Sequence, residues 1–469
     1  MKKKKIMTIT AAIPVALCGM AAGETIVTPK ETKSLSVSIY NQGTGLVKDT
    51  RAVPLTEGLN IISYAGISAS IRPETALLTG SGISVQEQNF NFDLLSKNSL
   101  LKKYIGKEIQ VIKTNPATGE ETTETATVLS AENGLILKIG DRIETDYLGR
   151  LIFPDIPKNL REKPTLTMEI NAKKEGSQDL QLTYLTGGLT WNADYVAKLN
   201  KTEDSIDLSG WVTLTNTSGT DYENADLQFI AGDVNIISPN FLEEQVFYAA
   251  NENVADEGME EERLMDYHLY SLGRKATILS NQTKQLALLS AYSIPAKKEY
   301  RFNHLLNTYK NYYSFENTSA EVKLIFTNDK KSNMGMPVPA GTIRVYKSDS
   351  KERVFFVGED TVKHTPENEK IELKLGDAFD VTAAGAETDR ISKGEKSWEA
   401  SYRMEFKNAT ENEVSVVYTQ IFPYDWVITK GTDKGSRYNS SQNKWEIKIP
   451  AKGKTILKFT VKVKGPEKK

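Results

Sequence analysis

The sequence TLTMEIN at residues 165–171, followed by DLQLTYL at residues 179–185, decides the fold class of this chain. In both stretches apolar and polar side chains alternate. A period of two residues is typical of a β-strand with one buried face. Neither stretch has the three-to-four-residue apolar spacing of an amphipathic helix. We therefore expect two strands here.

Similar stretches continue toward the C-terminus. Strands are predicted at residues 191–199, 208–215 and 225–230, and further strands are predicted through to the hairpin strands at 398–406, 414–421, 445–449 and 455–463. Short strands separated by polar turns every ~8–12 residues are typical of a β-sandwich. The pattern predicts a C-terminal β-sandwich region over residues 165–469 with two lobes.

The N-terminal half is also β-rich. Residues 24–95 predict a small antiparallel β domain, with clean alternation over 34–63. In residues 96–155, a helix at 96–105 precedes short strands joined by glycine turns, which suggests an inserted β-barrel module of SH3-like size. Prolines between 154 and 164 form a stiff connection to the next domain. The fold class expected is all-β: multidomain antiparallel β-sandwiches with a small inserted β-barrel module.

Two segments stand apart from this pattern. Residues 251–264 are acidic and lack periodicity, so we expect a mobile loop, and a Ca²⁺ site there is a weaker alternative because the Asp-x-Asp-x-Asp-Gly spacing is absent. Residues 207–230 and 397–421 share the order strand, asparagine-rich turn, strand. Related sandwich domains would produce this similarity, and so would ordinary hairpins, which we favour.

The first 23 residues have the three parts of a secretory signal peptide. Four lysines at 2–5 precede an uncharged, mostly apolar stretch, and small residues occupy 21–23. The stretch is too short for a ~20-residue membrane span. Cys18 follows Leu17, where a lipoprotein signal would have a small residue, so we interpret this cysteine as incidental. We expect an exported protein, periplasmic or associated with the cell envelope.

Composition excludes several classes of function. The chain has 469 residues, three histidines and one cysteine, which is a poor supply for a Cys/His zinc cluster. Loss of the four lysines with residues 1–23 leaves 55 basic against 61 acidic residues, a net charge of −6. A nucleic-acid-binding face would require a basic surface. We therefore expect no nucleic-acid partner and, since no second long apolar run occurs, no integral membrane segment.

Catalytic signatures are sparse. The three histidines lie far apart, and we find no Gly-x-Ser-x-Gly elbow, phosphate-binding loop or Rossmann fingerprint. A glycosidase needs two carboxylates at a set distance, but 61 acidic residues supply such pairs by chance. The sequence therefore assigns no catalytic residue, metal or cofactor.

Aromatic residues give the better binding candidates. Tyr309, Tyr312 and Tyr313 form a cluster that resembles an exposed interface, and Tyr424, Asp425 and Trp426 follow a proline in a loop-like stretch. Trp211 lies in the middle of a predicted strand, so we expect it in a sandwich core.

Several motifs resemble one bacterial family. They are YLTGGLTWNADY at 184–195, LSGWVTLTN at 208–216, DYHLY at 266–270, the run from 281 to 289, PAGTIRVY at 339–346 and GDAFDV at 376–381. Their order over about 180–465 resembles domain of unknown function 4139, whose relatives include mucoidy-inhibitor-A-like proteins. The resemblance implies an exported β-rich protein and no particular reaction. The long helical insertion of the mucoidy-inhibitor branch is replaced here by a small β module.

Two functions follow as hypotheses. The first is a non-catalytic cell-envelope protein that binds a protein or surface polymer, with an envelope protein or glycan as partner, through loops and edge strands. The second is a hydrolase of envelope glycan or peptide that uses an unidentified Asp/Glu pair. A flat apolar patch would favour the first, and a carboxylate pair with a raised pKa in a cleft would favour the second.

Overall fold

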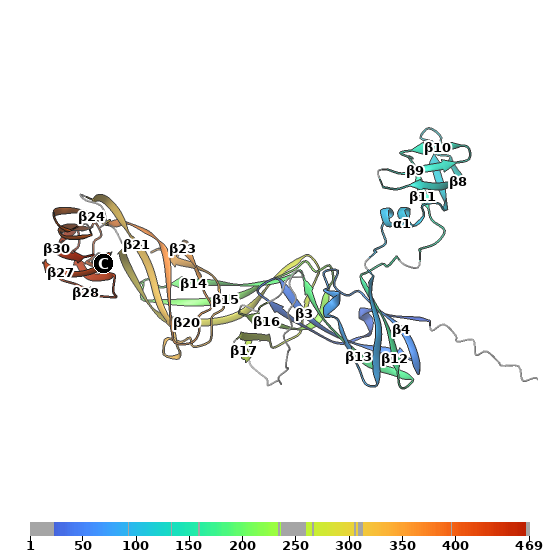
Figure 1. Ribbon diagram of the computed structural model, residues 1–469, viewed down its shortest axis with the longest axis horizontal. Coiled ribbons are helices and arrows are strands. Elements are labelled where there is room, and N and C mark those ends of the chain that lie inside the picture. Colours follow the sequence, from blue (N-terminus) through green and yellow to red (C-terminus); the bar gives the residue numbers. More distant parts are fainter. Residues whose placement is uncertain are drawn as a thin grey trace, which may run out of the picture. The chain divides into compact units, whose positions relative to one another are not determined.

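The computed structural model describes residues 23–91, 93–132, 134–157, 160–232, 235, 259–264, 267–303, 306–307, 313–394 and 396–465. Within these ranges the chain forms 30 strands and a single α-helix, α1 (Lys97–Lys103), so the all-β prediction is confirmed. In Figure 1 the colours of the strands follow the sequence, from blue near the N-terminus to red near the C-terminus. Residues 1–22 of the predicted signal peptide (1–23) lie outside the described residues.

The chain divides into two compact units. Unit 1 comprises Met1–Val37, Leu46–Gly187 and Ser218–Ala225. Unit 2 comprises Ser38–Gly45, Gly188–Thr217 and Asp226–Lys469. The two stretches that decide the fold class therefore belong to unit 1, although sequence analysis placed them at the start of the C-terminal region.

Unit 1 is built around a mixed four-stranded sheet. Strand β4 (Gly58–Ala65) pairs in parallel with β1 (Glu24–Val27) and antiparallel with β12 (Thr165–Ala172), which also pairs with β6 (Ile83–Asn91). In the same unit, β13 (Gly176–Gly187) pairs with β5 (Leu77–Thr79). The alternation of TLTMEIN is explained by this arrangement, because Leu166, Met168 and Ile170 are all buried.

A buried ion pair lies in unit 1. Arg51, on β3 (Thr44–Leu55), donates hydrogen bonds from Nε and Nη2 to Asp49 Oδ2, at 3.0 and 2.7 Å. Its Nη1 donates to the carbonyl oxygens of Val27 and Ala65, both at 2.8 Å. One guanidinium therefore links three strands, and its charge is balanced in a region that water does not reach.

The predicted insert is a separate five-stranded sheet beside α1 (Figure 1). Its strand order is β10 (Arg142–Thr145), β9 (Ile136–Ile139), β8 (Glu121–Ser130), β7 (Glu108–Thr114) and β11 (Arg150–Ile152). The described end strands β10 and β11 do not pair, so the sheet is open and the expected barrel closure is not found. Leu101 and Tyr104 from the end of α1 join the insert's core, so the helix buries apolar surface that closure would otherwise have buried.

Unit 2 contains a long, continuous sheet. Ten of its strands follow one path in the order β23, β22, β14, β15, β20, β21, β24, β25, β30 and β27. Their bounds are β14 Leu189–Leu199, β15 Ser205–Asn216, β20 Gln282–Asn303, β21 Ser314–Asn328, β22 Gly341–Ser348, β23 Val354–Val362, β24 Glu369–Gly394, β25 Ser397–Asn408, β27 Asp425–Gly431 and β30 Gly453–Lys464. Strands β26 (Val414–Ile421), β28 (Ser436–Arg437) and β29 (Gln442–Ile449) branch from this path.

The C-terminal part of unit 2 has an aromatic core. Trp445 stacks between Tyr418 and Phe459, with ring centroids 5.4 and 4.9 Å away. Trp398 and Trp426 belong to the same buried cluster. Long strand β20 contributes to this part through its C-terminal end, where it pairs in parallel with β26. Its N-terminal end instead pairs with β15, so one strand joins two packed regions of the unit.

The acidic segment differs from its prediction. Residues 251–258 lie outside the described residues, but Met259–Leu264 form β17, which pairs with β18 (Tyr267–Leu272). Met259 is buried, and Glu261 Oε1 lies 2.6 Å from His268 Nδ1. The mobile-loop prediction is therefore wrong for 259–264, because this end of the segment gains strand pairing, a buried side chain and a partner for a carboxylate.

The internal similarity is wider than the sequence indicated. Strands β15, β21 and β25 all end in an asparagine whose side chain is buried: Asn216, Asn328 and Asn408. In each case the side-chain amide donates to main-chain carbonyl oxygens of neighbouring loops. The structure thus adds Asn328 to the pair seen in the sequence, and the shared feature is a buried amide that holds a strand end to its loops.

Candidate binding surfaces

The first predicted aromatic cluster is only partly described. Tyr309 and Tyr312 lie outside the described residues. Tyr313 is half-buried and packs against the C-terminal core, and its carbonyl oxygen accepts a hydrogen bond from the Glu387 amide at 3.1 Å. The single described member of the cluster therefore contributes to packing.

The second predicted cluster separates into surface and core residues. Tyr424 is 41% exposed in the turn before β27, with a positive φ of 58° that is uncommon for a bulky residue. Asp425 is exposed at the start of β27. Trp426, however, is only 6% exposed, donates from Nε1 to the Ser440 carbonyl at 2.8 Å, and has the Arg437 guanidinium 4.2 Å above its ring. Its loop-like placement was wrong, because strand pairing and this cation–π contact hold it in the core.

Sequence analysis did not single out a third feature, the apolar start of strand β23. Val354, Phe355, Phe356 and Val357 are consecutive, and each side chain is between 37 and 59% exposed. Exposed apolar residues are common singly, but a contiguous group is informative. The sequence signal was four apolar residues in a row where a half-buried strand would alternate.

The outer edge of this part of β23 is open. Strand β23 ends the path of the sheet and pairs antiparallel with β22 on its inner side. Beyond Gly358, strand β24 covers the edge, since the amide of Lys374 donates to Asp360 Oδ2 at 2.7 Å. Within the described part of the chain, Val354–Val357 therefore present unpaired backbone groups together with apolar side chains, which is the surface that edge strands usually protect.

Two carboxylates of unit 2, Glu299 and Glu372, have pKa values below the ordinary range. Arg301 donates hydrogen bonds to Glu372 at 2.6 and 3.2 Å and to Glu299 at 2.5 Å. The bonds from Arg301 lower the pKa of Glu372 to about 2. Burial acts to raise the pKa of Glu299, but its bonds with Arg301 and Lys297 outweigh burial and lower it. Such groups serve as fixed hydrogen-bond acceptors rather than proton donors near neutral pH.

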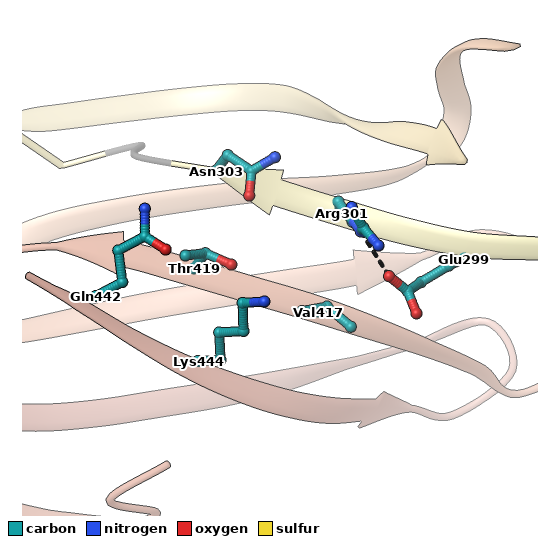
Figure 2. A pocket seen from close by; sticks show the side chains of 7 residues that line it. All are labelled: Glu299, Arg301, Asn303, Val417, Thr419, Gln442 and Lys444. Carbon is teal, nitrogen blue, oxygen red and sulfur yellow. Dashed lines mark hydrogen bonds and ion pairs between the residues drawn. The ribbon is translucent and has the colours of Figure 1, made fainter. Parts of the chain in front are cut away.

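These ion pairs border a depression of about 230 Å³ on the solvent face of unit 2. It is lined by side chains from β20, β26 and β29, which Figure 2 labels: Glu299, Arg301, Asn303, Val417, Thr419, Gln442 and Lys444. Six of the seven are polar or charged. The depression is thus chemically different from the apolar edge of β23.

The described ranges lack two kinds of feature, metal-binding groups and membrane-spanning helices. No group of three or more His, Cys, Asp or Glu side chains is placed to hold a metal ion among these residues. No helix among them is long and apolar enough to cross a membrane.

Comparison with known proteins places the chain in a family. A search among curated proteins finds no match. Residues 180–467 match the family described as Domain of unknown function (DUF4139). The matched range covers more than half of the chain and includes β14 through β30, with both the open edge of β23 and the polar depression. On this evidence, the chain belongs to the DUF4139 family.

Proposed function

We propose that this chain is a non-catalytic binding protein of the cell envelope, and that the open edge of β23 binds an extended segment of a partner protein. The observation that carries the proposal is the run Val354–Val357, whose four side chains are exposed along an unpaired strand edge. An added strand would satisfy the free backbone groups of β23 and cover its apolar side chains. This is the recognition mode called β-augmentation.

The size of the edge predicts reversible binding. At ~150–250 Å² for an aromatic side chain, half-exposed Phe355 and Phe356 present about 100 Å² each, and the four residues about 400 Å². The two partners would then bury about 800 Å² in total, below the ~1,200 Å² of stable interfaces. An interface of this size suits a transient complex better than a permanent dimer.

Charges beside the edge indicate the chemistry of the partner segment. Lys351 lies just before the apolar run and has no ion-pair partner among the described residues. Arg353, by contrast, is paired with Asp349 at 2.6 Å. We therefore expect the partner segment to carry alternating apolar side chains and an acidic residue opposite Lys351.

Export to the envelope is part of the same proposal. It rests on the lysine-rich start, the uncharged apolar stretch and the small residues at 21–23. A hydrolase with a paired Asp/Glu site is the alternative. The carboxylates beside the depression favour binding over this alternative, because Glu299 and Glu372 are ion-paired and their pKa values are lowered, whereas a general acid needs a raised pKa.

The test begins with a photo-crosslinking amino acid at position 354 of the full-length protein, expressed in its own cells. Capture is followed by identification of the cross-linked segment, synthesis of that segment as a peptide, and titration against the purified protein. We expect saturable binding that Val354→Lys weakens at least tenfold, since the substitution places a charge in the apolar contact.

The matched control is Val427→Lys. Val427 is 53% exposed on β27, the strand at the other end of the sheet path, so the chemistry of the substitution and its exposure are nearly the same. Equal weakening by both variants would overturn the proposal. A concentration-dependent dimer that Val354→Lys abolishes would also overturn it, because the occupant of the edge would then be a second copy of the chain.

A further inference from the structure

The polar depression is formed where three strands of unit 2 lie side by side. Asn303 on β20 pairs with Thr419 on β26, and Thr419 pairs in turn with Lys444 on β29. An amide, a hydroxyl and an ammonium group thus occupy one row across the sheet, at the ~4.8 Å spacing of neighbouring strands. Figure 2 shows these residues together with Gln442, the first residue of β29.

Two polar side chains in the depression have no hydrogen-bond partner among the described residues. Thr419 is only 4% exposed, yet its hydroxyl bonds to no described protein group. The side-chain amide of Gln442 is likewise without a described partner. The Thr419 oxygen is not among the fully enclosed polar atoms that lack a partner, so it is open to the depression. This hydroxyl and the Gln442 amide can therefore exchange hydrogen bonds with a molecule that enters the depression.

The charges of the depression are nearly balanced. The guanidinium of Arg301 is occupied by Glu299 and Glu372. Lys444 has no carboxylate partner in the described ranges, and its Nζ lies 3.3 Å from the centre of the Tyr438 ring. One ammonium against an aromatic face does not make the strongly positive pocket that a phosphate group would require. The amides and the hydroxyl instead suit a neutral ligand that both donates and accepts.

An aromatic ring adjoins the row of polar groups. Tyr438, in the turn after β28, is 63% exposed; its amide donates to the Gln442 carbonyl at 2.9 Å, and Lys444 Nζ lies over one face of its ring. A sugar ring has hydroxyl edges and a flat apolar C–H face, so it can use amide and hydroxyl partners and an aromatic ring together. From this combination we propose that the depression binds a hydroxyl-rich oligosaccharide, independently of the β23 edge.

The proposal is tested by titrating the purified full-length protein with oligosaccharides and following the amide and methyl signals of unit 2 by NMR. The probes are short, neutral malto-, cello- and chito-oligosaccharides at millimolar concentration, with inorganic phosphate as a separate probe. We expect at least one oligosaccharide to bind and phosphate not to bind. Thr419→Val and Gln442→Ala should each weaken that binding roughly fivefold, the change expected for one hydrogen bond of ordinary net strength.

Each variant has a matched control on the same strand. Ser415→Ala removes an exposed hydroxyl from β26 outside the depression and is the control for Thr419→Val. Lys448→Ala shortens an exposed side chain on β29 and is the control for Gln442→Ala. Failure of all the oligosaccharides to bind would overturn the proposal, as would binding of phosphate alone or equal effects of site and control variants. The Val354→Lys variant should bind the oligosaccharide normally, which separates this result from the outcome of the β23 test.

Discussion

Replacement of Asn408 by alanine should destabilise the C-terminal part of unit 2 by about 3 kcal/mol. The Asn408 amide donates to the carbonyl oxygens of Asn412, Ile449 and Pro450, at 2.8, 3.3 and 3.1 Å. Its Oδ1 accepts from the amide and hydroxyl of Thr410, at 2.9 and 2.7 Å. The residue is buried at the end of β25, so one side chain fastens two loops to a strand.

The magnitude follows from these five contacts. A net hydrogen bond contributes ~0.5–1.5 kcal/mol, and an orphaned buried group costs ~1–3 kcal/mol. The 3.3 Å contact is long, and Thr410 and Asn412 lie near the surface, where water can replace the lost bonds. We therefore expect about 3 kcal/mol rather than the sum over all five contacts.

Urea unfolding followed by tryptophan fluorescence measures this effect directly, because Trp398, Trp426 and Trp445 all belong to the surrounding core. With a slope of roughly 3 kcal/mol per M for a unit of this size, Asn408→Ala should lower the unfolding midpoint by about 1 M. The control is Asn412→Ala in the same turn, where the side chain is exposed, and its effect should stay within ~0.5 kcal/mol. Equal midpoints for the two variants would refute the assigned role of the buried amide.

Three further predictions concern stability. The pKa of Glu372 is about 2 in the folded protein against an ordinary value of 4.5, because of its bonds with Arg301. This carboxylate should therefore stabilise the fold above pH 4.5 and lose that contribution as the pH falls toward 2. Glu372→Gln should give a shallower acid unfolding transition, measured by circular dichroism across pH. Asp49→Asn leaves the Arg51 guanidinium buried without a counter-charge. The melting temperature of unit 1 should therefore fall by an amount corresponding to ~3–5 kcal/mol. An unchanged melting temperature would contradict the assigned role of the ion pair. Gly341→Ala should destabilise unit 2 strongly, because the new methyl group would overlap the backbone carbonyl of the paired residue on β14; thermal unfolding equal to that of the unmodified protein would contradict this.

The sequence predicted strands well because alternation is a local property. The residues TLTMEIN alternate in the sequence, and their apolar members are buried in the structure. The open apolar edge at Val354–Val357 was also visible as a break in alternation, but its exposure depends on which strand ends the sheet. The order of the strands cannot be predicted from local alternation, since pairing is set by packing over the whole unit.

The binding residues were harder to predict for the same reason. Asn303 and Thr419 are neighbours only because β20 and β26 pair in parallel across more than a hundred residues of chain. Trp426 followed a proline and looked like part of a loop, yet the neighbouring hairpin covers its ring with Arg437. Trp211 on β15 was expected in a sandwich core and is 38% exposed. Long-range pairing thus decides which aromatic side chains face solvent.

The measurement that tests the central claim most directly is amide hydrogen exchange of the purified full-length protein, with and without the partner segment captured from position 354. If β23 binds by strand addition, the backbone amides of residues 354–357 that face the open edge should become strongly protected, and those of β27 should not change. Unchanged exchange at 354–357 in the presence of a saturating segment would contradict the claim that this edge is the binding surface.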